Sequence, residues 1–199
     1  MKKKRIIILV VLFLFMFSIV SCSIIRISYI NRIFPDPVIK SHMIGEIITG
    51  GNVSICIDEA ELYNGDEIES KYNFTNPAQN EDGTRITGDQ FKVLTICLSV
   101  INNTNEAQEI SLAQFYAESL TWSNGIDAQL FPVFNSDNKD TDYLDPQRIE
   151  LTPNQIKKVY LTYTIFHFQF NPIEWEKIKI DNFDLSLSRY PVKHIVTLC

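Results

Sequence analysis

The sequence has few of the residues and motifs that mark several common classes of protein. Its 199 residues include three histidines and four cysteines, with no CxxC pair and no HExxH motif, so no zinc site is predicted. A P-loop, a GxGxxG fingerprint and a GxSxG elbow are also absent, which leaves nucleotide binding and serine hydrolysis without motif support. We therefore expect a protein that is not an enzyme and needs no cofactor.

Positive charge is scarce outside the N-terminus. The chain has 18 basic and 24 acidic residues, and residues 2–5 account for four of the basic ones. The remainder is acidic and would be repelled by phosphates, so nucleic acid is excluded as a partner. With only 7 Gly and 8 Pro but 12% aromatic residues, the chain has the composition of a folded domain rather than a disordered one.

The N-terminal cations precede a long apolar run. Residues 6–25 carry no charged side chain, and twenty helical residues reach about 30 Å, the thickness of a bilayer's hydrocarbon core. One interpretation is a single-pass transmembrane helix, because the chain stays apolar beyond Cys22. Such a helix would stop before Phe34-Pro35, since the residue preceding a proline disfavours helical geometry.

Another interpretation is a lipoprotein signal peptide. Ile19, Val20 and Ser21 form a loose lipobox before Cys22, which would then be the acylated residue. An ordinary cleaved secretory signal is a third. All three keep the cations inside and place the rest of the chain on the extracytoplasmic face of the cell membrane. We expect an anchor or signal over residues 1–25, a juxtamembrane spacer over 26–39 and a folded domain over 40–199.

Alternating apolar and polar residues dominate the expected domain. Period-two patterns over residues 53–58, 93–100, 159–165 and 183–188 predict strands with one buried face. The apolar phase changes between residues 165 and 168, which predicts a β-bulge or a bend between sheets.

Turn and cap residues complete the prediction. Asn124-Gly125 predicts a two-residue hairpin between strands at 115–122 and 126–134. Asn171 and Pro172 predict the start of a short helix. Seven to nine strands and no long amphipathic helix after residue 35 indicate an all-β fold, an antiparallel immunoglobulin-like β-sandwich behind an N-terminal hydrophobic helix.

Several motifs are shared with a known group of proteins. They are Phe34-Pro-Asp-Pro37, Gly45-Glu46, the 90–102 strand that ends in Asn-Asn-Thr, and the ending from Trp175 to Lys193. The chain resembles the uncharacterised, membrane-anchored, extracytoplasmic domains with a telokin-like immunoglobulin fold of Gram-positive-type bacteria. The resemblance covers about residues 30–199 and implies a sandwich on a short anchor. It implies no catalytic or ligand residues, and Cys22 departs from it.

A few residues are candidates for chemistry or contact. Cys56 and Cys97 lie on the wetter faces of two predicted strands, where they would form either a disulfide or two free thiols. The insertion 64–89 is acidic and carries Tyr72 and Phe74, which would either contact a partner or fold back onto the sheet. The acidic loop 135–148 has carboxylates but not the spacing of a calcium loop, so no metal site is predicted.

These observations favour a non-enzymatic binding or interaction domain held at the membrane by its N-terminal segment, with an envelope protein as partner. The alternative is a structural or accessory subunit of a cell-envelope complex. An envelope hydrolase remains as the residual alternative.

Overall fold

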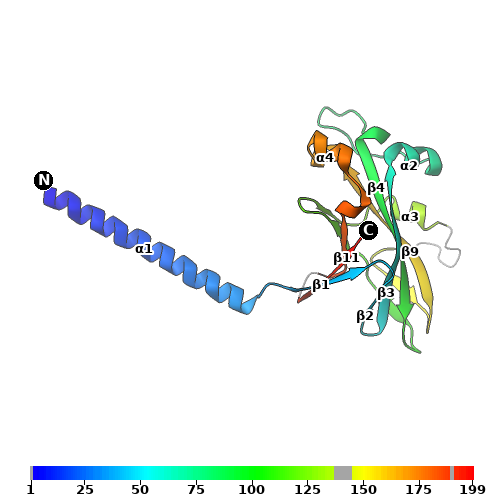
Figure 1. The fold of residues 1–199 in the computed structure, drawn as a ribbon, viewed down its shortest axis with the longest axis horizontal. Helices are drawn as coiled ribbons and strands as arrows, with labels where there is room; N and C mark the ends of the chain where they lie inside the picture. The colour runs from blue at the N-terminus through cyan, green and yellow to red at the C-terminus, as the bar shows by residue number, and fades with distance from the viewer. Residues whose placement is uncertain (1, 137–144, 189–190) are drawn as a thin grey trace. The chain divides into compact units, whose positions relative to one another are not determined.

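The computed structural model describes residues 2–136, 145–188 and 191–199, with side chains described from Leu12 onward. The chain divides into two compact units, Met1–Val38 and Ile39–Cys199. The first unit contains one long helix, and the second contains the sheets (Figure 1).

The N-terminal unit is formed by α1 (Lys2–Ile33). Its stretch Leu12–Ile33 has 22 residues and a mean hydropathy of 1.9, and none of it is buried within the chain. By length and composition this stretch is able to cross a membrane. The helix ends just before Phe34-Pro35, as predicted from the constraint that proline places on the preceding residue.

Three long strands dominate one sheet of the second unit (Figure 1). This antiparallel sheet has the order β2-β3-β4-β9. Its strands are β2 (Ile47–Gly50), β3 (Val53–Asn64), β4 (Phe91–Asn102) and β9 (Ile156–Phe166). Strands β3, β4 and β9 follow the period-two patterns of the sequence, because each has one face that packs against the rest of the domain.

The second sheet has five shorter strands in the order β1-β11-β10-β6-β7. They are β1 (Val38–Met43), β11 (Val192–Thr197), β10 (Asp184–Ser186), β6 (Tyr116–Glu118) and β7 (Ser123–Asn124). A separate pair, β5 (Gln108–Ile110) and β8 (Ile149–Leu151), completes the described strands. The domain is a β-sandwich of two main sheets, which confirms the predicted fold class.

The main core lies between the sheets. Its fully buried side chains include Leu94, Ile96, Leu98, Leu161, Tyr163, Leu185 and Val196. Burial of one such side chain contributes about 1.5–3 kcal/mol. This apolar layer is therefore the principal source of the domain's stability.

A β-bulge in β3 changes which residues face this core. The register with β4 shifts between Ile57 and Glu59. Before the bulge Ile57 points inward, and after it Ala60 and Leu62 take that position, so the apolar phase passes from odd to even residues. Because one extra residue flips every following side chain, Glu59 and Glu61 point away from the core.

A smaller apolar cluster covers part of the outer face of this sheet. Residues 64–89 are not a patternless insertion, since they contain α2 (Gly65–Tyr72), whose Ile68 is fully buried. Ile68 packs with Ile86 and with Phe91 and Val93 of β4. Helix α3 (Phe131–Phe134) adds Phe134. Figure 1 shows α2 and α3 on the same side of the long strands.

Two local predictions are confirmed. Helix α4 (Pro172–Lys177) begins as expected, with the Asn171 side chain accepting a hydrogen bond from the Glu174 backbone N–H at 2.9 Å. The phase change after Ile165 is a bend between sheets, because η2 (His167–Gln169) follows β9 and the chain then crosses to β10.

The hairpin predicted at Asn124-Gly125 was wrong. Strands β6 and β7 pair instead through an earlier turn at residues 119–122, in which the Ser119 backbone N–H donates to the Trp122 carbonyl at 2.7 Å. The Asn124 side chain instead accepts from the Gly125 N–H and donates to the Thr164 carbonyl of β9. Tertiary bonds therefore override the local turn preference.

A histidine pair ties the first strand of the sandwich to the last. Nε2 of His42 in β1 lies 3.0 Å from Nδ1 of His194 in β11, and the rings stack with centroids 5.2 Å apart. Nδ1 of His42 lies 3.2 Å from a carboxylate oxygen of Glu46. One imidazole must donate and the other accept across the His–His contact, so the pair holds the strands together only while one ring is neutral.

Candidate ligand-binding site

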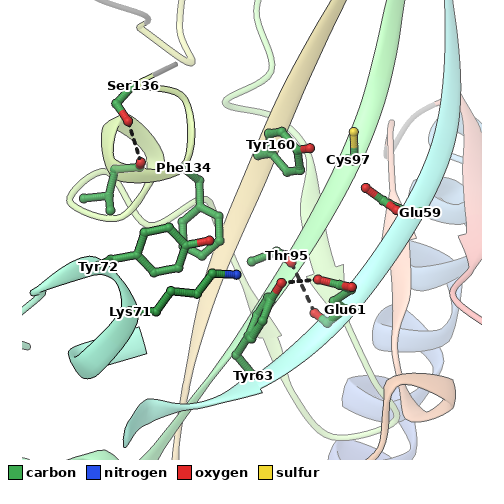
Figure 2. A pocket seen from close by; sticks show the side chains of 11 residues that line it. Glu59, Glu61, Tyr63, Lys71, Tyr72, Thr95, Cys97, Phe134, Ser136 and Tyr160 are labelled. Atoms are coloured by element: carbon green, nitrogen blue, oxygen red, sulfur yellow. Dashed lines mark hydrogen bonds between the residues drawn. The ribbon is translucent and has the colours of Figure 1, made fainter. Parts of the chain in front are cut away.

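A hollow of about 520 Å³ lies on the outer face of the four-stranded sheet, beside the small apolar cluster (Figure 2). Three neighbouring strands form its floor, with Glu59, Glu61 and Tyr63 from β3, Thr95 and Cys97 from β4, and Tyr160 from β9. Lys71 and Tyr72 of α2 and Val133 and Phe134 of α3 also line it, and the rings of Tyr72 and Phe134 lie next to each other. Ser136 completes the lining.

Strand register aligns the floor residues in rows. Glu59 is opposite Cys97, which is opposite Tyr160, and Glu61 is opposite Thr95. Directly opposed side chains in a sheet lie close enough to interact. The β-bulge is what brings both glutamates into these rows, because the unbulged phase would turn them toward the core.

Aromatic rings form part of the lining of the hollow. The rings of Tyr72 and Phe134 have centroids 4.5 Å apart at an interplanar angle of 39°, and Tyr63 lies 6.2 Å from Phe134. The Lys71 ammonium lies 5.4 Å from the Tyr63 centroid and 5.3 Å from the Tyr72 centroid. Figure 2 shows this ammonium pointing into the hollow between the two tyrosines. Both distances are within the range of cation–π attraction.

The hydroxyl and thiol groups of the floor are held neutral. The Tyr63 hydroxyl donates to a carboxylate oxygen of Glu61, and burial together with that carboxylate raises the pKa of Tyr63 well above its usual value. Burial also raises the pKa of the Cys97 thiol. The pKa of Tyr160 is raised as well, first by the negative charge that Cys97 would carry as a thiolate at high pH and then by burial. Among the described lining residues, the formal charges are those of Glu59, Glu61 and Lys71.

The thiol at the floor of the hollow is shielded from solvent and is held in its protonated form. Cys97 is 2% exposed, and a thiol whose pKa is raised is a poor nucleophile at neutral pH. No histidine is among the residues that line the hollow. In the part of the chain that the structure describes, no group of three or more His, Cys, Asp or Glu residues is arranged to hold a metal ion.

Another hollow, of about 630 Å³, opens between the two sheets. Its lining includes Ile48 of β2 and Ile55 of β3 in the four-stranded sheet. Leu187, which follows β10, and His194 of β11 line it from the five-stranded sheet. Its described lining has one carboxylate, Glu109, and one phenyl ring, Phe115, so it combines fewer charged and aromatic groups than the outer hollow. The outer hollow is the better candidate for specific binding.

Cys56 and Cys97, for which a disulfide and two free thiols were the alternatives, are both free thiols in the structure. Cys56 is opposite Ser99 in the β3–β4 ladder, whereas Cys97 is opposite Glu59. The two cysteines are thus diagonal neighbours, typically about 7–8 Å apart in a sheet. A disulfide requires Cα atoms about 4.4–6.8 Å apart, so the free-thiol alternative fits the register.

The two aromatic candidates of residues 64–89 have different positions. Tyr72 lines the hollow, while Phe74 is partly buried against the small apolar cluster. Cys22 is exposed within α1. Asp137, Asp140 and Asp142 of the acidic loop lie outside the described residues.

Sequence reasoning missed Glu59, Glu61, Lys71, Phe134 and Tyr160 as site residues. A signal for the two glutamates was present, because the apolar phase of β3 passes from Ile57 to Ala60 and Leu62. That slip indicates a bulge and hence a strand whose second half turns its charges outward. The contributions of α2 and α3 depend on tertiary packing that no local pattern reveals.

Comparison with known proteins places the chain in a family. A family model described as "Domain of unknown function (DUF5028)" matches residues 46–194. The chain belongs to this family. The DUF5028 match includes every residue that lines the outer hollow, so the hollow is within the family domain. No curated protein sequence matches the chain.

Solved bacterial structures are similar to the chain at low sequence identity. An uncharacterised β-sandwich protein from Clostridium difficile 630 is 12% identical with a TM-score of 0.48, covering 82% of this chain and 97% of its own. The yjhA protein from Bacillus subtilis is also 12% identical, with a TM-score of 0.46 and coverage of 79% and 99%. A conserved hypothetical protein from Bacillus anthracis is 10% identical, with a TM-score of 0.45 and coverage of 74% and 88%.

Proposed function

We propose that this DUF5028 protein is a non-enzymatic binding domain, displayed on the extracytoplasmic face of a bacterial cell membrane by its N-terminal helix. In this proposal residues 1–25 anchor the chain, 26–39 connect, and 40–199 form a sandwich of the telokin-like immunoglobulin type. The observation that carries the binding role is the outer hollow, where aromatic and charged side chains from three strands and two helices converge.

Support for the location comes from the N-terminal unit. Four cations precede the apolar stretch of α1, and basic residues favour the cytoplasmic side of a membrane. The sandwich begins after the other end of that stretch. A protease-sensitive tag placed after Cys199 should be cleaved in intact cells from which the wall has been removed. A tag that is protected until the membrane is permeabilised would contradict the proposal.

The anchor is proposed to be a single-pass helix. Helix α1 continues for eleven residues beyond Cys22, whereas an acylated mature protein would start at Cys22 and lose the apolar run before it. Intact mass measurement of the membrane-bound protein should give a chain that begins at Met1. A chain that begins at an acylated Cys22, and a mass that changes when Cys22→Ala blocks processing, would instead establish the lipid anchor.

The binding half of the proposal is tested with point variants in the full chain. Deletion of residues 64–89 would remove Ile68 and expose the small apolar cluster, so it would disturb folding as well as contact. Tyr72→Ala is milder, because this ring lies at the edge of the cluster. Envelope proteins retained by the wild-type chain should be lost with Tyr72→Ala and kept with Ile173→Ala, whose side chain is exposed elsewhere. Equal retention by both variants would count against the hollow.

A structural or accessory role in an envelope complex is the second candidate. Leu120 is 100% exposed and Ile173 is 66% exposed, and both line a shallow hollow of about 390 Å³ beside α4. Neighbouring exposed apolar side chains are typical of contact surfaces between proteins. Loss of retained partners with Ile173→Ala, and not with Tyr72→Ala, would favour this role.

A further inference from the structure

We propose that the outer hollow binds a small organic ammonium ion, of the quaternary or methylated amine type, and that Lys71 is a built-in competitor for the same aromatic surface. The inference rests on the proposed binding function and adds the chemical class of the ligand. It is argued from the ring geometry, the carboxylates of the floor and the place of the Lys71 ammonium.

The aromatic part of the hollow has the composition of a cation site. Tyr63, Tyr72 and Phe134 come from three different elements, and their ring centroids lie 4.5–6.2 Å apart in the Tyr72–Phe134 and Tyr63–Phe134 pairs. The face of an aromatic ring carries partial negative charge, so clustered rings attract cations that are weakly hydrated. Quaternary and methylated amines meet that condition, because methyl groups replace their N–H donors.

The floor supplies carboxylates that match a cation. Glu59 and Glu61 are exposed on the bulged half of β3 and line the hollow together. Among the lining residues that the structure describes, these two carboxylates outnumber the Lys71 ammonium, so this part of the lining has a net negative charge. The Glu61 carboxylate also accepts a hydrogen bond from the Tyr63 hydroxyl. This bond holds the Tyr63 ring next to the negative charge of Glu61. An incoming cation would therefore meet rings and carboxylates in the same space.

Lys71 shows where such a cation would sit. Its ammonium lies within 5.4 Å of two ring centroids, at the end of a flexible side chain that is exposed on the last turn of α2. The Lys71 ammonium therefore already makes the cation–π contacts with Tyr63 and Tyr72 that a bound ammonium ligand would make. Because a lysine side chain has many other solvated rotamers, it can move away from the rings when a cation with higher affinity for them binds.

The competitor role gives Lys71 an effect of opposite sign to its neighbours. If Lys71 recognised an anionic group of the ligand, its removal would weaken binding. If it occupies the cation's place, Lys71→Met frees the rings and removes a repelling charge, so a cation should bind more tightly. This difference in sign separates an ammonium ligand from a carboxylate or phosphate ligand.

The test is calorimetric titration of the full chain in maltoside micelles, which contain no choline headgroups, with tetramethylammonium and choline. Choline is paired with its uncharged isostere 3,3-dimethylbutanol, which should not bind. Tyr72→Ala should weaken binding about tenfold, the loss expected for one cation–π contact in a partly desolvated site. Tyr72→Phe should restore it. Glu61→Gln, which keeps an acceptor for Tyr63, should weaken it several-fold.

Lys71→Met should tighten tetramethylammonium binding several-fold, while the matched variant Lys177→Met on α4 should leave it unchanged. Equal binding of choline and the isostere would overturn the proposal, and so would loss of binding in Lys71→Met or no heat from either cation. None of these results would alter the tag cleavage or partner retention of the proposed function, so the two can fail separately.

Discussion

The two faces of the β2-β3-β4-β9 sheet are made by the same long strands and are covered very differently. On the inner face, alternate residues of β4 from Leu94 to Val100 are all fully buried against the opposite sheet. On the outer face, Phe91 and Val93 are buried under α2, but Thr95 and Cys97 lie at the floor of the hollow. Thr95 and Cys97 are also buried, but by the other residues that line the hollow, so the proposed binding site begins where α2 no longer covers the sheet.

The contrast shows how a stable sheet can also carry a recognition surface. The inner face supplies enough apolar burial to hold the strands rigidly, so the outer face is free to present polar groups at fixed spacings. The β-bulge of β3 is the local device that allows this, because it keeps Ala60 and Leu62 in the core while it turns Glu59 and Glu61 outward. Recognition residues placed on strands are positioned more accurately than those on loops.

The largest difference in stability between the two faces of the sheet should come from shortening a side chain of the inner face. Leu161→Ala removes a fully buried side chain of β9 and should lower the free energy of unfolding by about 2–5 kcal/mol. On the outer face, Thr95→Val keeps the shape and loses one hydrogen bond to the Glu61 carbonyl, 3.4 Å long, at a cost of about 1 kcal/mol or less. Chemical denaturation of both variants measures the difference, and equal losses would break the contrast.

A second prediction concerns the cover of the outer face. Gly65 and Gly88 bring the start of α2 against η1 (Gly88–Gln90), and a Cβ on Gly88 would collide with the backbone of Asp66. Gly88→Ala should therefore destabilise the domain by about 1–3 kcal/mol and displace α2. Gly125→Ala is the matched control, because its nearest contact would be an ordinary 3.7 Å to the Tyr116 ring. Thermal melts of the two variants should differ, and matching melts would show that α2 is not tightly docked.

Acid should act on the opposite sheet rather than on the hollow. Burial, His42 and Lys40 lower the pKa of His194, so the unfolded chain binds a proton more readily than the native one. The stabilisation is full above the ordinary histidine pKa of about 6.5 and is lost as the pH falls below it. The melting temperature should fall between pH 7 and pH 5, and His194→Asn should flatten that slope. An unchanged slope in the variant would exclude the histidine pair as its source.

The smallest expected effect is one of reactivity, with no change in stability. In the full chain with Cys22→Ser and Cys56→Ser, Cys199 is exposed while Cys97 is 2% exposed, and burial raises the Cys97 pKa. A maleimide at neutral pH should label Cys199 at least about tenfold faster than Cys97. Mass spectrometry of the labelled peptides gives the ratio. Comparable rates would mean that the floor of the hollow is open and reactive.

The strands could be predicted from the sequence because burial on one face leaves a period of two. Residues 93–100 and 159–165 show this period and lie within β4 and β9, and residues 183–188 contain the short strand β10; the apolar side of each strand faces the core. The cap of α4 was also predictable, since Asn171 and Pro172 act through contacts within one turn. In both cases the cause is local to the segment.

The candidate site was mostly beyond sequence reasoning for the opposite reason. Helix α2 has only eight residues and is held by Ile68 against β4, which lies more than twenty positions along the chain. Helix α3 replaces a strand that the apolar residues around Phe131 had predicted, because Phe131 is buried there as part of a helix. Of the lining residues, Tyr72 was singled out beforehand as a contact residue and Cys97 only as a disulfide candidate. The neighbours of Tyr72, Lys71 and Phe134, follow from the packing of two short helices on a sheet.

The most direct test of the account is photocrosslinking in intact cells, with a benzoylphenylalanine placed in turn at Tyr72 and at Ile173 of the full chain. Position 72 lies in the outer hollow, and position 173 lies in the exposed apolar surface beside α4. We predict that an extracytoplasmic partner or ligand-bearing molecule is captured from position 72 and not from position 173. Capture from position 173 alone would contradict the claim that the outer face of this sheet is the binding face.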